Sequence, residues 1–194
     1  NLALYPNGKF ADLSLNLLGL FYYQNKEYKE AAKRFLELSK SVSWLKVEGL
    51  FYAALSFEAM NEVEKAKDLR KRIYTEYPDS KYAADSYFRY YSYQEYVQGD
   101  RSSIKHLQSF VGLFRDTELL LNAHYLLGMD YTRDRKTIDG KWIRKKSLTS
   151  AIDHFQLAVS SFDKFYSEGK LQQELDYFVT VRYFAMLEKG ITCL

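Results

Sequence analysis

The sequence predicts an all-α protein built from pairs of helices that stack on one another. Three observations indicate this class. The 194 residues include only two prolines and nine glycines, which leaves few turn signals for many short strands and favours long helices. A seven-residue phrase recurs along the chain. Between its copies, small residues recur at a fixed spacing.

The repeated phrase marks the junctions between units. Residues 5–11 read YPNGKFA and residues 77–83 read YPDSKYA, 72 positions later, and weaker copies begin at Phe114 and Tyr166. Half of this separation is about 36 residues, close to the period of roughly 34 that is typical of helix-turn-helix repeats. We therefore expect one array of four units and a terminal helix, at residues 12–43, 47–79, 85–116, 121–165 and 171–189.

The first two units share the same spacing of small residues, and aromatic residues lie near these positions in the sequence. Gly19 is followed 12 positions later by Ala31, and Ala54 is followed 12 positions later by Ala66. Small residues let the two helices of a pair approach closely, and aromatic residues fill the space beside them. These aromatic residues are Tyr22, Phe35, Phe57, Tyr131 and Phe155. Pro78 ends the second unit, because proline cannot continue a helix.

The third unit is a degenerate copy, and the fourth departs from the spacing. Gly128 and Ala151 lie 23 positions apart, so 11 extra residues separate the two helices of the fourth unit. This inserted loop, residues 133–147, surrounds Trp142 with the basic residues Arg133, Arg135, Lys136, Lys141, Arg144, Lys145 and Lys146. Loops longer than the local norm are often functional. We expect it to bind an acidic partner surface or an anionic membrane; the alternative is that Trp142 folds back onto the helices.

Two segments carry the pattern of a known repeat. Leu18-Gly19-x-x-Tyr22, followed by Ala31 and Phe35, and Leu127-Gly128-x-x-Tyr131 resemble the tetratricopeptide repeat family, and the resemblance covers essentially the whole chain. It implies a right-handed α-solenoid. The junction phrase is similar to that of a bacterial envelope branch of this family, which includes the lipoprotein of the outer-membrane β-barrel assembly machinery and the Tol-Pal-associated periplasmic proteins. Those proteins are non-catalytic and hold other proteins in place.

The resemblance implies that a segment of a partner protein binds along the first helix of each pair. Residues on these helices that point away from the second helix are then the binding face: Asn16, Tyr23, Phe51, Glu58, Arg89, Tyr93, Tyr96, Asn122, Tyr125 and Arg133. Amide groups can pair with an extended backbone, and tyrosines offer apolar contact with a polar tip. Arg89 and Arg133 can take a carboxylate. The alternative is that several of these tyrosines cover the next repeat.

Catalytic and metal-binding patterns are absent from the sequence. His106, His124 and His154 fall in different predicted helices and outside zinc-binding spacings, and His124 is expected to be a packed structural residue. Cys193 is the single cysteine, so it can form neither an internal disulfide nor a cysteine metal site. We expect no enzyme activity, no cofactor, no metal and no small-molecule substrate.

The net charge and the junction phrases lead to expectations about the partner class and the cellular compartment. A net charge of +3 is far below that of a dedicated nucleic-acid binder, so a nucleic-acid-binding array ranks last. The leading expectation is a periplasmic scaffold, anchored to the outer membrane as a lipoprotein; the alternative is a cytoplasmic adaptor or chaperone. The junction phrase at residue 5 predicts a further repeat upstream, which the apolar side of Leu13, Leu17 and Leu20 would partly face.

Overall fold

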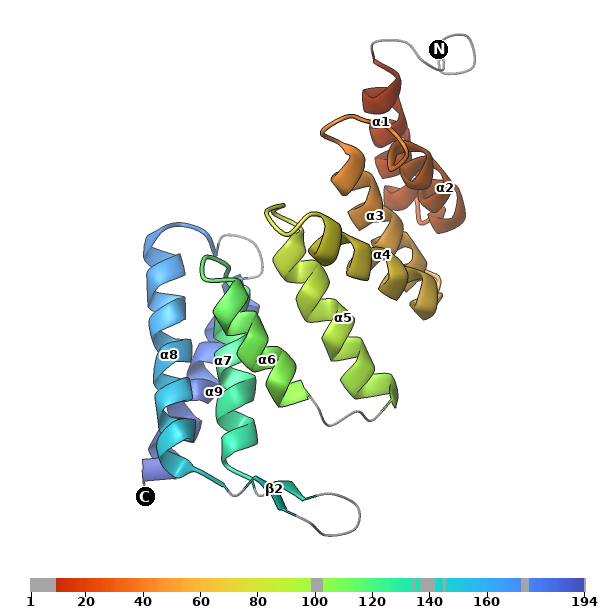
Figure 1. Ribbon diagram of the computed structural model, residues 1–194. Coiled ribbons are helices and arrows are strands. Elements are labelled where there is room, and N and C mark those ends of the chain that lie inside the picture. The colour runs from red at the N-terminus through yellow and green to blue at the C-terminus, as the bar shows by residue number, and fades with distance from the viewer. Residues whose placement is uncertain are drawn as a thin grey trace. The chain divides into compact units, whose positions relative to one another are not determined.

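A computed structural model describes residues 10–98, 103–133, 135–136, 142–144, 146–171 and 175–193. Over these ranges the protein is all-α, as predicted, apart from one short pair of strands. The helices of the first half are α1 (Ala11–Gln24), α2 (Tyr28–Leu38), α3 (Lys46–Ala59), α4 (Val63–Glu76) and α5 (Ala83–Gln98). Those of the second half are α6 (Ser103–Leu113), α7 (Leu119–Tyr131), α8 (Leu148–Ser167) and α9 (Leu175–Cys193) (Figure 1).

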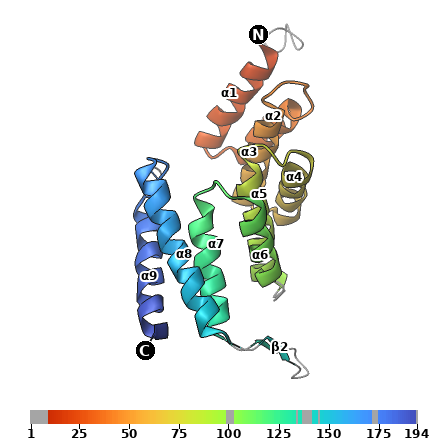
Figure 2. The same cartoon turned by 60° about the vertical axis from the view of Figure 1, so that its left-hand side comes forward.

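The chain divides into two compact units, Asn1–Tyr93 and Gln94–Leu194. In unit 1, α1 packs on α2, α2 on α3 and α3 on α4. In unit 2, α6 packs on α7, α7 packs on α8, and α9 packs on both α8 and α7. Figure 2 shows α7, α8 and α9 side by side. Helices that follow one another in the chain therefore pair in space within each unit.

Glycine allows the closest helix approaches in both units. A Cβ atom added at Gly19 would lie 2.7 Å from the Phe35 ring, and one added at Gly128 would lie 2.5 Å from the Phe155 ring. Both rings are fully buried. The predicted arrangement of a small residue on the first helix against an aromatic ring on the second is confirmed at these two places.

The turns that close the first two helix pairs are alike. Lys26 follows α1 with a φ of 62°, and Asn61 follows α3, 35 positions later, with a φ of 59°. This left-handed conformation ends a helix by letting the next amide donate back to a carbonyl of the last turn. Such bonds, 2.9 Å and 2.8 Å long, run from Glu27 to Tyr22 and from Glu62 to Phe57. The same local geometry thus recurs at a spacing of 35 residues.

Each unit has a hydrophobic core of its own. In unit 1 the buried cluster consists of Ala31, Phe35, Leu50, Ala53, Ala54, Leu69 and Ile73. In unit 2 it consists of Leu121, Ala151, Phe155, Ala158, Phe162, Phe165, Leu171, Val181 and Ala185. Leu171 belongs to this core and lies in a turn, and α9 begins at Leu175.

The outer side of α1 is apolar and exposed. Leu13 and Leu17 are exposed on it, together with Phe10 and Phe21. Leu20 is half-buried and packs against the core of unit 1. The junction phrase at residue 5 lies outside the described residues, and the further repeat upstream stays a prediction.

The insertion of the fourth unit contains the short pair of strands. β1 (Arg135–Lys136) pairs antiparallel with β2 (Trp142–Arg144). At its base, the amide of Ser147 donates to the carbonyl of Tyr131 over 2.9 Å, and the Ser147 hydroxyl caps α8 by accepting from the Ser150 amide. The end of α7 and the start of α8 are therefore joined directly, as in a pair that has no insertion.

Candidate functional site

Six of the predicted partner-binding residues belong to unit 1, on the helices expected to come first in each pair, and the side chains of five of them are described. We call this set the first-helix row: Asn16 and Tyr23 on α1, Phe51 and Glu58 on α3, and Arg89 on α5. The structure connects all five through direct contacts or through residues that they share.

At one end of the first-helix row, a carboxylate joins two helices. Glu48 on α3 accepts a hydrogen bond from Asn16 Nδ2 over 3.0 Å and another from the Tyr82 hydroxyl over 3.0 Å. Burial, followed by this bond to Glu48, raises the pKa of Tyr82 well above that of a free tyrosine. The side-chain oxygen of Asn16 is buried and has no hydrogen-bond partner. Asn16 is thus held by the hydrogen bond from its side-chain nitrogen to Glu48, while its side-chain oxygen has no donor.

In the middle of the row, Phe51 has a packing position. Its ring stacks on that of Tyr82 at 4.4 Å between centroids. The guanidinium of Arg70 lies 4.7 Å from the centre of the Phe51 ring, within the range of a cation–π contact. The half-buried Phe51 therefore packs within the first-helix row. A contact between Phe51 and a partner stays a prediction.

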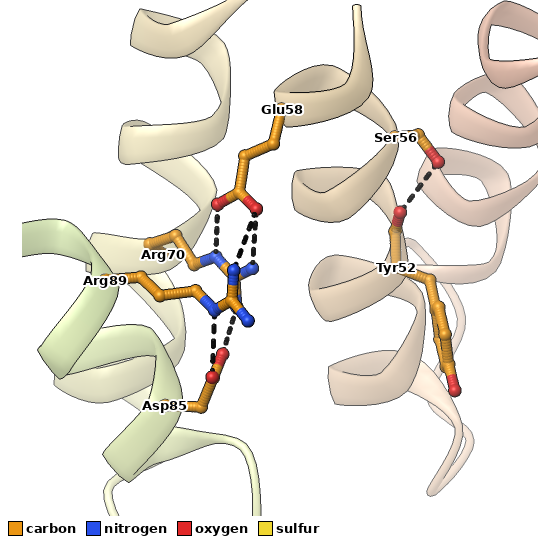
Figure 3. A network of polar contacts seen from close by, with 6 residues as sticks. All are labelled: Tyr52, Ser56, Glu58, Arg70, Asp85 and Arg89. Carbon is orange, nitrogen blue, oxygen red and sulfur yellow. Dashed lines mark hydrogen bonds and ion pairs between the residues drawn. The ribbon is translucent and has the colours of Figure 1, made fainter. Parts of the chain in front are cut away.

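Arg70 is the centre of an ion-pair network (Figure 3). Its side chain is 1% exposed. It binds both oxygens of Glu58, through Nε at 3.0 Å and Nη2 at 3.2 Å, and it binds Asp85 through Nη1 at 2.7 Å. Arg89 completes the network, with Nε 2.9 Å from Asp85 Oδ1 and Nη1 3.7 Å from Glu58 Oε2. Two guanidinium groups thus face two carboxylates, and the four charges sum to zero.

This network changes the expectation for Arg89. The sequence suggested an arginine available to take a carboxylate, but Arg89 already pairs with Asp85 and Glu58. Its side chain is half exposed. A partner carboxylate would therefore compete with two carboxylates of the protein for the same guanidinium group.

At the other end of the row, Tyr23 lies within the field of this network. Its ring meets Tyr28 and Tyr52 edge to face, with centroids 5.4 Å and 6.4 Å away. Burial is the main cause that raises the pKa of Tyr23; the negative charge of Glu58 adds to this, while Arg89 opposes it. Tyr23, Glu58 and Arg89 come from α1, α3 and α5, so three successive first helices contribute to one polar and aromatic face.

The predicted residues of unit 2 are less closely connected. On α7, Asn122 is buried with its side-chain oxygen unpaired, and Tyr125 lies 6.1 Å from the Phe155 ring between centroids. Burial, and then the charge of Glu188, raises the pKa of Tyr125. Arg133 is exposed after the end of α7. Tyr96 of unit 2 and Tyr93, the last residue of unit 1, lie on α5, but their side chains are outside the described part of the structure.

The basic insertion is described only in part. Arg135 and Lys136 form β1, and Trp142 and Arg144 lie in β2, but the side chains of these four residues are outside the description. Lys141 and Lys145 are not described, and Lys146 is exposed. The predicted binding role of the insertion therefore stays a prediction.

Sequence reasoning missed a pair of histidines. His124 on α7 and His154 on α8 place their Nδ1 atoms 3.1 Å apart, with the rings stacked at 5.3 Å. The Tyr131 ring also stacks on His154, with centroids 5.4 Å apart. The 30 residues between the two histidines correspond to no ligand motif. Across the described ranges, no group of three or more His, Cys, Asp or Glu side chains is placed to hold a metal ion.

Comparison with known proteins adds no assignment to this geometry. No protein-family model matches the chain, and no curated protein matches it at a significant level. None of the helices in the described ranges is both long enough and apolar enough to cross a lipid bilayer.

Proposed function

We propose that the chain is a non-catalytic scaffold that binds a segment of another protein along its first helices. The observation that carries this proposal is the convergence of Tyr23, Glu58 and Arg89 from α1, α3 and α5. We further propose that the helix pairs are tetratricopeptide-like repeats stacked into a right-handed solenoid. The matching turns at Lys26 and Asn61, and the matching Gly–Phe contacts in the two units, support this interpretation.

The chemistry of the first-helix row suits an extended polypeptide. A tyrosine offers an apolar ring with a polar tip, and the half-exposed Arg89 side chain is accessible from solvent. Because the Arg70 network is neutral and holds its members from three helices, the face is pre-formed, so binding costs little side-chain ordering.

Photo-crosslinking tests this proposal. With benzoylphenylalanine in place of Tyr23, we expect a specific adduct with a protein partner in cells that make the chain. The matched control places the same group at Lys33, an exposed residue on α2, a second helix. An equal yield of the same adduct from Lys33 would contradict binding along the first helices.

Variants then measure the contribution of the face. Tyr23→Ala and Arg89→Gln should each weaken binding of the identified partner by about five- to tenfold, the usual effect of a moderate interface residue. Circular dichroism and thermal melting serve as controls. If Tyr23→Ala lowers stability strongly, or if neither variant changes affinity, the face has a packing role and the proposal fails.

The cellular compartment is a separate proposal. We propose a location in the bacterial envelope, because the phrases at residues 5–11 and 77–83 are similar to those of envelope repeat proteins. The alternative is a cytoplasmic adaptor or chaperone. Protease treatment of intact spheroplasts distinguishes the two: an envelope protein is degraded, whereas a cytoplasmic one is protected until the cells are lysed.

A further inference from the structure

The loop between α2 and α3 displays two large apolar side chains to solvent. We call residues 39–45 the Trp44 loop. Val42 is fully exposed in it, and Trp44 is 83% exposed. Leu45, at the end of the loop, is buried and anchors it to unit 1. Phe10, just before α1, is also exposed, and Figures 1 and 2 place the start of α1 near this loop.

Hydrogen bonds within the segment fix the Trp44 loop. The Ser43 amide donates to the Ser41 hydroxyl over 3.3 Å, and the Leu45 amide donates to the Ser43 hydroxyl over 3.0 Å. The amides of Lys40 and Ser41 donate to carbonyls of the last turn of α2. Most backbone donors of the loop therefore need no water. A segment with satisfied backbone groups can leave bulk water at a lower cost than an open loop.

The charged side chains within and directly after the loop are both positive. Between residues 39 and 46 the charged side chains are Lys40 and Lys46. The nearest acidic residues along the chain, Glu37 and Glu48, are engaged elsewhere: Glu37 pairs with Arg34 at 3.2 Å, and Glu48 accepts from Asn16 and Tyr82. Two lysines thus flank the apolar tip of the loop.

We infer that the Trp44 loop binds the surface of an anionic lipid membrane, with Val42 and Trp44 entering the interface and Lys40 and Lys46 facing the headgroups. Tryptophan favours the membrane–water interface, and lysines near an anionic bilayer add attraction. A protein partner would need a cavity shaped for a protruding valine and tryptophan, whereas a bilayer accepts such a convex tip directly. This inference rests on residues outside the first-helix row and is independent of the proposed function.

Tryptophan fluorescence provides the test. The chain has two tryptophans, so Trp142→Phe leaves Trp44 as the single reporter. With vesicles of phosphatidylcholine and phosphatidylglycerol in equal parts, we expect a blue shift of Trp44 emission and its quenching by brominated lipids. With phosphatidylcholine alone, the response should be much weaker.

Vesicle sedimentation of full-length variants tests whether the Trp44 loop is the part of the chain that binds the membrane. Val42→Ser with Trp44→Ser should lower the partition constant on anionic vesicles by roughly tenfold or more, because the apolar anchor is lost. Replacing Lys40 and Lys46 by glutamine should lower it by about fivefold per lysine. The matched control is Leu113→Ser at another exposed apolar position, which should leave partition unchanged.

Three outcomes would overturn the inference. The first is Trp44 emission that does not respond to anionic vesicles. The second is sedimentation that the loop variants leave unchanged. The third is a crosslinker at position 44 that captures a protein in cells while the purified chain ignores vesicles, which would assign the loop to a protein partner. Val42, Trp44, Lys40 and Leu113 are exposed and Lys46 is half-buried, so melting temperatures are measured for every variant. Values that match that of the unmodified chain exclude unfolding as the cause of lost binding.

Discussion

Arg70 places a positive charge inside unit 1, where it holds together residues from two other helices. Glu58 lies on α3 and Asp85 on α5, and both bind the same guanidinium group. Removing one member of a buried charge network is costly because the remaining charges lose their compensation. Without Arg70, two carboxylates would face Arg89 alone.

We therefore predict that Arg70→Met lowers the free energy of unfolding by about 2 to 4 kcal/mol. Methionine keeps most of the side-chain volume, so the loss reports charge and hydrogen bonding rather than a cavity. The control is Arg72→Met on the same helix, where the exposed pair with Glu76 should be worth less than about 1 kcal/mol. Urea unfolding measures both; equal effects would show that Arg70 has no special role.

The histidine pair makes stability depend on pH. Burial, together with the neighbouring His154, lowers the pKa of His124 from 6.5 to about 4. Burial also lowers the pKa of His154, although Asp153 opposes this. Between about pH 6.5 and pH 4 the unfolded chain therefore binds a proton that folded His124 does not. Stability is then complete above pH 6.5 and is lost as the pH falls towards 4.

For His124 alone, the full pKa difference would change the free energy of unfolding by about 3 kcal/mol between high and low pH. Because the ring is only partly buried, we expect a change of about 1 to 2 kcal/mol. We predict that His124→Phe reduces the difference in unfolding free energy between pH 7 and pH 4.5 by this amount. The control is His106→Phe, at a histidine outside the pair. It should leave unchanged the pH dependence of stability that the His124–His154 pair causes. An unchanged pH dependence in His124→Phe would refute the prediction.

At the scale of single residues, the sequence was informative where side-chain size decides the packing. Gly19 and Phe35 follow a repeat pattern, and the structure brings them together. Arg70 follows no such pattern, because a charged residue on a second helix ordinarily faces solvent. Its burial depends on Glu58, Asp85 and Phe51, which lie on other helices, and no local spacing reveals such an arrangement.

Among the elements, the pairing of successive helices depends on two glycines. Gly19 and Gly128 each face a buried phenylalanine ring at a distance that leaves no room for a methyl group. In the first pair the Phe35 ring is also stacked on Tyr52 at 5.2 Å, so it cannot easily move aside. The space between the helices is therefore set by the absence of a side chain.

We predict that Gly19→Ala and Gly128→Ala each destabilise the protein by about 1 to 3 kcal/mol, through overpacking that exceeds the gain in helix propensity. Gly112 on α6 provides the matched control, since no heavy atom outside its local surroundings lies within 4 Å of an added Cβ. There, alanine should stabilise by about 0.5 to 1 kcal/mol. Stabilisation at all three positions in thermal melts would contradict this account.

The elements themselves were predictable to different degrees. Helices long enough to show a periodic pattern of small and apolar residues were expected from the sequence. The strands were not, because β1 has two residues and β2 has three, too few for alternation to be recognised.

For the whole molecule, the central feature is the presence of two cores. The buried clusters of the two units share no residue, and each cluster is built from helices of its own unit. We predict that a fragment ending at Gln98, after α5, folds by itself. It should have a helical circular dichroism spectrum and melt cooperatively. A fragment without cooperative melting would show that unit 1 needs the rest of the chain.

The bond from the Ser147 amide to the Tyr131 carbonyl makes the insertion a side branch of the fold. The bond brings the two ends of the insertion together at one place. Another sequence can therefore be inserted at this position. A peptide tag, a fluorescent reporter or a loop of another length can replace the insertion while α7 and α8 keep their packing. The same property leaves natural variation free to change the length and chemistry of this segment without rebuilding the protein around it.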